Sequence, residues 1–287
     1  MKLALGTAQF GFAYGIARPQ PQIGFAESKA IIDSAFREGM TVLDTAMGYG
    51  ESETRLGLIG VKKWKVISKL PVVPAGENVT TWIANAVKAS LEKLKIESLY
   101  GLLLHRPEQL LGNIGPEINA ALQRLKAEGL VEKIGISIYQ PSELDSIFSV
   151  AEVDLVQSPL SVLDRRLITS GWLDRLADRG VEVHARSVFL QGLLLMSADQ
   201  RPQKFDRWAD LWARYHGWVA STGLTRLQAC IAYVSALPQV QQVVVGVNGL
   251  NHINEILQAQ TRQEPIWTPD LATEDEQLLN PLAWLKI

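Results

Sequence analysis

The strongest constraint on the fold is a regular alternation of short apolar segments with longer segments of helical periodicity. Eight segments have the length and composition of buried strands: 2–5, 41–43, 65–68, 99–104, 131–137, 153–157, 181–185 and 242–246. Each precedes a segment with apolar residues at helical spacing, namely 25–38, 51–59, 79–93, 116–128, 141–148, 170–179, 225–235 and 251–259. Eight such pairs favour a closed parallel barrel over an open sheet of about five to seven strands. We therefore predict an α/β fold, a single (β/α)8 TIM barrel over residues 1–287.

The alternation has one irregularity, a long stretch from Val188 to Ala220 between the seventh strand and its helix. Trp208 and Trp212 lie four residues apart in this stretch, which places both rings on one face of a helix. We interpret the stretch as an extra helical excursion packed on the barrel. The tail after Thr268 is expected to pack over a barrel end, with Trp284 as its anchor.

The composition argues against several classes of protein. The formal net charge is −2 and the pI about 6.1, so no basic surface for nucleic acid is expected. Cys230 is the single cysteine, which rules out an internal disulfide, and we expect it to be buried as a small apolar side chain. The first residues lack the pattern of a signal peptide, and Pro238 interrupts the uncharged segment 227–254. We expect no membrane span and a cytoplasmic protein.

Four polar residues are predicted to meet at one end of the barrel. Asp44 comes at the end of the second strand, Lys69 after the third and His105 after the fourth. Tyr49 lies between two glycines in the loop after the second strand. Taken singly, these residues have simpler explanations, such as a helix cap, a surface ring, a solvated charge and a loop histidine. The C-terminal ends of neighbouring strands nevertheless form one working face in such barrels, so we expect the four together.

As a set, these side chains fit the polarisation and protonation of a carbonyl group. The reference pKa of tyrosine is about 10, so a tyrosine that exchanges a proton near neutrality needs support for its phenolate. The ammonium of Lys69 would supply that support, and the carboxylate of Asp44 would hold the lysine charged and in place. His105 would then orient a carbonyl oxygen between itself and Tyr49.

Nearly the whole chain resembles the aldo-keto reductase superfamily, through the segments GTAQFG, LDTAMGYGESETRLG, VISKL, LLLHRP, KIGIS, VDLVQSPLS, HARSVFLQGLL and VVVGVNGLNHINEIL. The resemblance implies NAD(P)H-dependent reduction of an aldehyde or ketone, or the reverse oxidation of a sugar or alcohol hydroxyl. It makes Tyr49 the general acid, with Lys69 lowering its pKa, Asp44 pairing with Lys69 and His105 orienting the substrate. The cofactor would supply the hydride.

The same resemblance implies where the cofactor binds. The carboxamide of the nicotinamide would lie near two side chains at strand ends, the pyrophosphate along a turn after the seventh strand, and the adenosine at the start of the last helix. The residues assigned to the cofactor are Gly6, Thr7, Ser137, Gln157, Arg186, Ser187, Leu190, Gln191, Gly192, Gly246, Asn248, His252 and Glu255. NADP(H) is expected over NAD(H), although the adenosine end lacks the lysine and arginine of many NADPH-selective relatives.

Two positions depart from the family's pattern. Ile138 stands where an asparagine is frequent, and Arg186 stands where a tyrosine usually stacks on the nicotinamide. Arg186 would stack on the ring, pair with an acid, or anchor an acidic substrate. Phe10, Tyr14 and Tyr139 are predicted to line an aromatic substrate pocket suited to an aldehyde or a sugar-like carbonyl.

The sequence leaves two other functions open. One is a cofactor-binding regulatory protein that resembles the potassium-channel β subunits and has little turnover. The other is a metal-dependent barrel enzyme, but none of the four histidines pairs with another ligand at metal-site spacing, so no metal is predicted. The expected partner is a small-molecule substrate, and the expected state is a monomer or weak homo-oligomer.

Overall fold

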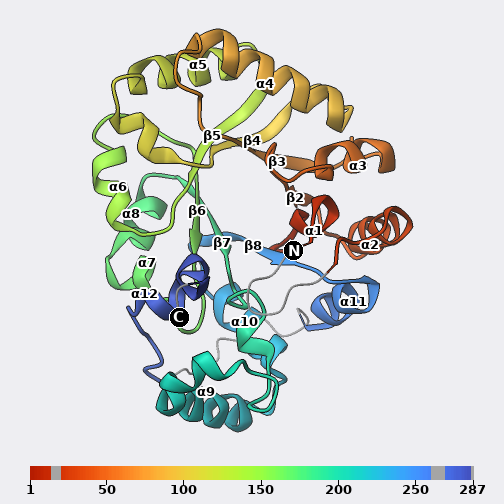
Figure 1. Cartoon of the computed structure of the whole chain (residues 1–287), viewed down its shortest axis with the longest axis vertical. Coiled ribbons are helices and arrows are strands. Elements are labelled where there is room, and N and C mark those ends of the chain that lie inside the picture. Colours follow the sequence, from red (N-terminus) through yellow and green to blue (C-terminus); the bar gives the residue numbers. More distant parts are fainter. Residues whose placement is uncertain (14–20, 260–268, 286–287) are drawn as a thin grey trace.

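The structure, a computed structural model, describes residues 1–13, 21–259 and 269–285. Eight parallel strands form a closed barrel in which each strand pairs with the next and the last pairs with the first (Figure 1). The strands are β1 (Leu3–Gly6), β2 (Val42–Asp44), β3 (Lys65–Leu70), β4 (Leu99–Leu104), β5 (Val131–Ser137), β6 (Leu155–Pro159), β7 (Glu182–Arg186) and β8 (Val240–Gly246). The predicted (β/α)8 barrel is therefore confirmed, with strand ends that differ by one or two residues.

Helices surround the barrel and complete the repeating pairs (Figure 1). They are α2 (Phe25–Arg37), α3 (Ser52–Ile59), α4 (Val79–Leu94), α5 (Gly115–Ala127), α6 (Ser142–Ile147), α8 (Trp172–Asp178), α10 (Arg226–Ser235) and α11 (Leu250–Ala259). Shorter elements lie between them: α1 (Ala8–Gly11), η1 (Pro107–Leu111), α7 (Arg166–Thr169), η2 (Leu193–Leu195), η3 (Gln203–Trp208), α12 (Glu276–Leu279) and η4 (Pro281–Leu285). The predicted sixth helix is shorter than expected, because Gly171 takes a φ of 74° immediately before α8.

Apolar side chains fill the barrel in two shells. The inner shell consists of side chains that point to the barrel axis from the strands, namely Ala4, Val42, Ile67, Leu103 and Leu155. The outer shell packs between strands and helices and includes the buried face of α4, with Ile83, Val87, Leu91 and Leu94. Because strand residues alternate between these shells, a polar residue two positions after an inward apolar residue also points inward. The polar side chains at the strand ends therefore point into the barrel mouth.

The predicted helical excursion after the seventh strand is present as η2, η3 and α9 (Ala209–Thr222). Trp212 and Trp218 are buried in α9, and Trp284 from the tail is fully buried with its ring 5.0 Å from that of Phe205 in η3. The tail thus packs against the excursion through the anchor that the sequence indicated. Cys230 is also buried. Within the described residues, no helix is long and apolar enough to cross a membrane.

Candidate active site

A buried ion pair lies at the C-terminal ends of β2 and β3. Lys69 follows the inward-pointing Ile67 by two residues, and its Nζ lies 2.8 Å from Oδ1 and 2.6 Å from Oδ2 of Asp44. The ammonium also donates to the carbonyl of Thr45 at 2.9 Å. Lys69 is 1% exposed and Asp44 4%, so both charges are removed from water and satisfied by each other. The predicted pairing of these two residues is therefore present.

Gln157 approaches the same ion pair from β6. Its Nε2 donates to Oδ1 of Asp44 at 2.7 Å, and its side chain is almost fully buried. The sequence assigned this amide to the carboxamide of the cofactor, but here its nitrogen holds the carboxylate. Gln157 therefore belongs to the network that fixes Asp44, a contact that no spacing in the sequence indicates.

Tyr49 lies above the ion pair on a tight loop. Gly50 takes a φ of 51°, and a Cβ there would lie 2.7 Å from the carbonyl oxygen of Gly11, so a side chain at this position would push α1 away. The loop brings the ring of Tyr49 edge-on to His105, with centroids 6.1 Å apart, and leaves the Nζ of Lys69 5.2 Å from its centroid. The structure thus brings Asp44, Tyr49, Lys69 and His105 together, as the strand order predicts.

The pKa of Tyr49 differs from the expectation. Burial, and then the negative charge of Asp44, raise the pKa of Tyr49 well above its ordinary value, while Arg186 opposes that rise. Burial and the charge of Asp44 outweigh the opposing positive charge, so the pKa lies above its ordinary value rather than below it. The phenol therefore stays protonated at neutral pH, which is the state that a proton donor requires.

His105 is held at the end of β4 in its neutral form. Its backbone N–H donates to the carbonyl of Leu70 at 3.0 Å, which fixes the loop start beside β3. Burial, followed by the positive charge of Lys69, lowers the pKa of His105 to about 4, and Arg186 and Arg106 act in the same direction. A neutral imidazole can donate one N–H to a carbonyl oxygen without carrying charge itself.

Two arginines flank Tyr139 on the other side of the mouth. The guanidinium carbon of Arg186 lies 4.7 Å from the centroid of the Tyr139 ring, and that of Arg106 lies 5.8 Å from it. Arg186 donates to the carbonyl of Ile138 at 2.8 Å and to Oγ of Ser187 at 3.2 Å. The side chain at the position of the family's stacking tyrosine is thus tied to the loop after β5. Arg106 was not among the residues singled out in the sequence, although it directly follows His105.

The turn after β7 contains several residues with positive φ. Ser187, Leu190, Gln191 and Gly192 have φ values of 60°, 47°, 51° and 87°. The backbone N–H groups of Leu190 and Gly192 donate within the turn, to the carbonyls of Ser187 at 2.8 Å and Phe189 at 2.9 Å, and the side chain of Leu190 is buried. The pyrophosphate site expected at this turn stays a prediction.

Residues at the end of β1 contact the strand end that carries Asp44. Gly6 pairs in register with both Asp44 and Gly246, and Oγ1 of Thr7 donates to the carbonyl of Asp44 at 3.0 Å. Thr7 is fully buried and binds Ser52 as well, so its side chain serves the loop that carries the ion pair.

A carboxylate occupies the start of α11, where the sequence places the adenosine. Oε1 of Glu27, from α2, accepts from the backbone N–H of Leu250 at 3.2 Å. The backbone N–H of Asn248 donates to Nδ1 of His252 at 3.3 Å, which turns that imidazole back onto the helix start. Glu255 is exposed one turn further along.

Comparison with known proteins identifies the family. Residues 2–265 match the Aldo/keto reductase family. The chain belongs to this family. The protein is therefore an oxidoreductase of this family, and membership implies a nicotinamide cofactor.

Individual relatives of the reductase are distant. The uncharacterized oxidoreductase YqkF of Bacillus subtilis is 26% identical over 260 residues, which cover 83% of this chain and 84% of that protein. The 6-dehydroglucose reductase of Agrobacterium fabrum is 29% identical over 195 residues, covering 60% of this chain and 65% of that protein. The NADH-specific methylglyoxal reductase of Escherichia coli is 27% identical over 183 residues, covering 56% of each. The chain thus spans less than two thirds of the last two.

Solved structures confirm the fold of the reductase. The holo form of the aldo-keto reductase AKR11C1 from Bacillus halodurans superimposes with a TM-score of 0.71, at 20% identity, over 93% of this chain and 88% of that one. In the part of this chain that the structure describes, no group of three histidine, cysteine, aspartate or glutamate side chains is placed to hold a metal ion.

The predicted aromatic lining of the reductase's substrate pocket needs correction. Phe10 is fully buried on the core side of α1, so it cannot contact a substrate. Phe12, two residues on, instead places its ring 5.9 Å from that of Tyr49, at right angles to it. Tyr139 is half-buried at the mouth, as expected, and Tyr14 lies outside the described residues. Phe10 and Phe12 lie two residues apart in the segment GTAQFGF, so their spacing does not tell which ring faces the mouth. The turn of α1 decides that it is Phe12.

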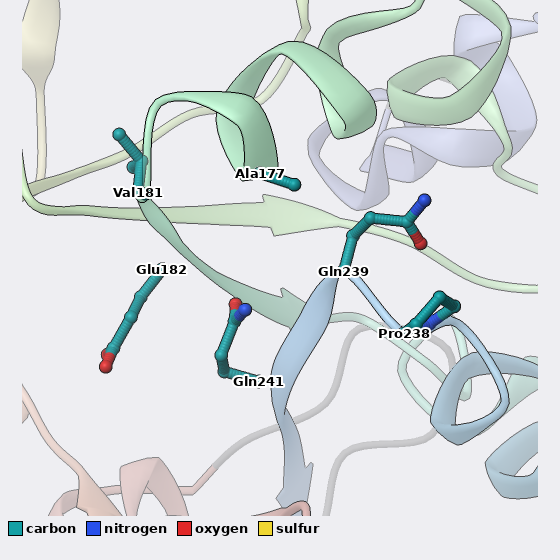
Figure 2. Close-up of a pocket in the computed structure, with 7 residues that line it drawn as sticks. Ala177, Val181, Glu182, Pro238, Gln239 and Gln241 are labelled. Carbon is teal, nitrogen blue, oxygen red and sulfur yellow. The ribbon is translucent and has the colours of Figure 1, made fainter.

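A separate hollow of about 300 Å³ opens at the other end of the barrel (Figure 2). Figure 2 shows Val181, Glu182, Gln239 and Gln241 around it, at or beside the starts of β7 and β8, with Ala177 from α8. Its one carboxylate already accepts hydrogen bonds from the hydroxyl of Tyr100 and the ammonium of Lys133. This hollow lies at the N-terminal end of the strands, away from the polar cluster, and we do not assign the reaction to it.

The low pKa of His105 predicts a pH-dependent stability. Because the pKa is about 4 in the folded protein and near 6.5 in the unfolded chain, the unfolded chain binds a proton in that interval that the folded protein does not. The free energy of unfolding should therefore fall as the pH is lowered from about 6.5 toward 4, by on the order of 2 kcal/mol from this group. Urea denaturation of the wild type and His105→Gln across this interval measures the contribution. An equal pH dependence in the two proteins would contradict it.

Proposed function

We propose that this protein catalyses NAD(P)H-dependent reduction of an aldehyde or ketone, with the reverse oxidation of an alcohol as its other direction. The observation that carries the proposal is the position of a protonated phenol, Tyr49, edge-on to a neutral imidazole, His105, above the buried pair of Asp44 and Lys69. This arrangement offers two neutral hydrogen-bond donors to one oxygen atom in a partly dehydrated mouth.

The reaction follows from these donors. A reduced nicotinamide cofactor, when bound, would supply the hydride for the carbonyl carbon. As the C=O π bond opens, negative charge develops on the oxygen, where the phenol of Tyr49 and the N–H of His105 stabilise it. Tyr49 then transfers its proton to that oxygen, which completes the alcohol.

The charged pair beneath the phenol has a positioning role in this scheme. When Tyr49 gives up its proton, the phenolate forms 5.2 Å, measured from the ring centroid, from the ammonium of Lys69. Asp44 holds that ammonium in place before the proton moves, and Gln157 in turn holds Asp44, so little reorganisation is needed. The positive charge of Lys69 would thus stabilise the phenolate as it forms.

Several described residues would hold the cofactor. The turn 187–192 would lie along the pyrophosphate, and Ser137, almost fully buried at the end of β5, would be available to the carboxamide. Gln157 would offer the carboxamide its oxygen, because its nitrogen binds Asp44. A Cβ at Gly246 would lie 3.0 Å from Nε2 of Gln9, so a side chain at this position would displace that amide.

We further infer a preference for NAD(H), against the expectation of NADP(H). The start of α11 would bind the 2′-phosphate of NADPH, but the carboxylate of Glu27 already accepts from Leu250 there. A second anion at this position meets like-charge repulsion, whereas a free ribose hydroxyl can donate to a carboxylate.

Replacing Glu27 with glutamine should shift this preference toward NADPH. The amide oxygen of the variant can still accept from the N–H of Leu250, so only the charge is removed. Because Glu27 is exposed, we expect a modest change, with NADPH binding about five- to tenfold more tightly relative to NADH. Titration of tryptophan fluorescence with both nucleotides measures the ratio, and Glu38→Gln, at the exposed far end of α2, is the control. An unchanged ratio in Glu27→Gln would show that the carboxylate does not discriminate.

The proposed function is tested by the same titration followed by turnover. We expect at least one reduced nucleotide to quench tryptophan fluorescence, and a panel of aldehydes then to remove the nicotinamide absorbance. Nucleotide binding without turnover of any aldehyde would favour the regulatory alternative over the reductase. Failure to bind either nucleotide would contradict both.

A further inference from the structure

The arginines around the mouth differ in how their charges are used. Arg166 is paired with Asp164 and with Glu276, and Arg165 donates to the carbonyls of Val162 and Pro269. Arg106 and Arg186, in contrast, have no carboxylate within ion-pair distance among residues 1–13, 21–259 and 269–285. Two guanidinium charges therefore face the mouth without a neutralising partner from the described chain.

These two charges converge on one place. Both guanidinium groups lie against the ring of Tyr139, Arg186 at 4.7 Å and Arg106 at 5.8 Å from its centroid. Arg186 is fixed there by the carbonyl of Ile138, and Arg106 extends from the residue that follows His105. Both guanidinium groups therefore lie close to the ring of Tyr139 at the edge of the site.

The charge of both arginines reaches the reacting groups. Arg186 and Arg106 each lower the pKa of His105, and Arg186 also lowers that of Tyr49. Asp44 is the carboxylate that opposes them at His105, and it is already bound to Lys69. The nearby carboxylate of Glu143 accepts from the backbone N–H groups of residues 139 and 140, at the start of α6. The mouth consequently carries an excess of positive charge.

The geometry points to a substrate that carries an anionic group as well as its carbonyl, with a carboxylate or a phosphate held by Arg106 and Arg186 and the carbonyl oxygen held between Tyr49 and His105. This assignment rests on the proposed reductase function and specifies its substrate class. Guanidinium groups suit both anions, because their planar N–H pairs match carboxylate and phosphate oxygens. A neutral carbonyl would leave the half-buried charge of Arg186 without a counter-charge, while the exposed Arg106 would remain solvated.

The test compares substrates that differ only in the anion. Succinic semialdehyde is paired with butanal, and glyceraldehyde phosphate with glyceraldehyde, so the two arms separate a carboxylate from a phosphate. For at least one arm, the wild type should show a KM about tenfold or more lower for the anionic member. Arg106→Gln should raise that KM by about tenfold, equivalent to ~1.4 kcal/mol, and affect the neutral member much less. Arg124→Gln, an exposed arginine on α5, should leave all four values unchanged.

A second variant and a binding measurement separate the possible failures. Arg186→Gln should also raise the KM for the anionic member, and nucleotide titration shows whether its cofactor affinity has changed. Equal KM changes for anionic and neutral members in Arg106→Gln, or no anionic preference in the wild type, would overturn the assignment. If no carbonyl is turned over, the proposed function fails, and calorimetric titration with hydroxybutanoate and glycerol phosphate still decides the anion site. If the wild type binds either of these anions and Arg106→Gln does not, the anion site is supported. If the wild type binds neither anion, the assignment is overturned.

Discussion

Replacing Tyr49 with phenylalanine is expected to lower kcat for carbonyl reduction by about 10²- to 10⁴-fold, because it removes the only proton that the proposed scheme delivers to the alkoxide. The ring is retained, so its edge contacts with His105 and Phe12 should persist and the loop should keep its shape. Nucleotide affinity should therefore change little. Steady-state kinetics with one aldehyde, together with nucleotide titration, measures both quantities.

The control for this variant is Tyr233→Phe, which also removes one phenolic hydroxyl, but from α10 rather than the mouth. Its kcat should match the wild type. A Tyr49→Phe protein that keeps most of its kcat would contradict the assignment of Tyr49 as proton donor. Loss of nucleotide binding together with activity would point to a structural role instead.

The raised pKa of Tyr49 gives the reaction a direction-dependent pH profile. Because burial and Asp44 keep the phenol protonated through neutral pH, reduction should not lose rate through this group as the pH approaches the ordinary tyrosine value near 10. Alcohol oxidation needs the deprotonated form and should become faster as the pH rises.

Replacing Lys69 with methionine is expected to destabilise the folded protein by about 3–5 kcal/mol. The variant leaves the carboxylate of Asp44, which is 4% exposed, without its partner in the barrel interior. Gln157 still donates one hydrogen bond to it, but an amide does not neutralise a charge. Urea denaturation gives the change in free energy of unfolding. Lowering the pH should reduce the loss, because protonation of Asp44 removes the isolated charge.

The double variant Asp44→Asn and Lys69→Met provides the matched comparison. It removes both charges, so its free energy of unfolding should recover a large part of what Lys69→Met loses. Both proteins should be poor catalysts, since neither can place a positive charge beneath the phenolate. A double variant no more stable than Lys69→Met would show that the loss comes from packing of the lysine stem rather than from the buried charge.

The sequence by itself determined the barrel and the membership of its polar cluster. Eight apolar segments alternating with amphipathic ones admit few arrangements, and consecutive parallel strands must lie side by side. Asp44, Lys69 and His105 come at or beside the ends of three consecutive strands, so the topology alone brings them to one mouth. Trp284 and Cys230 were likewise recognisable as buried from residue type.

Only the tertiary structure decided how the side chains in the mouth share their partners. The amide of Gln157 reaches Asp44 across the barrel from β6, and Glu27 reaches the start of α11 from α2. Phe12 rather than Phe10 meets Tyr49. Contacts of this kind depend on barrel closure and on the angle at which each helix packs, which hydrophobic periodicity does not encode.

The charges of the site also depend partly on the sequence and partly on the tertiary structure. Residue types alone predicted that a lysine near a tyrosine would lower its pKa, but burial and the negative charge of Asp44 raise the pKa of Tyr49 overall. Desolvation depends on how much chain surrounds a group, and Coulomb interaction on which neighbour is nearest, so both follow from three-dimensional packing. The sequence therefore determined which groups meet, and the folded structure decided which of them carry protons and which charges are left for a ligand.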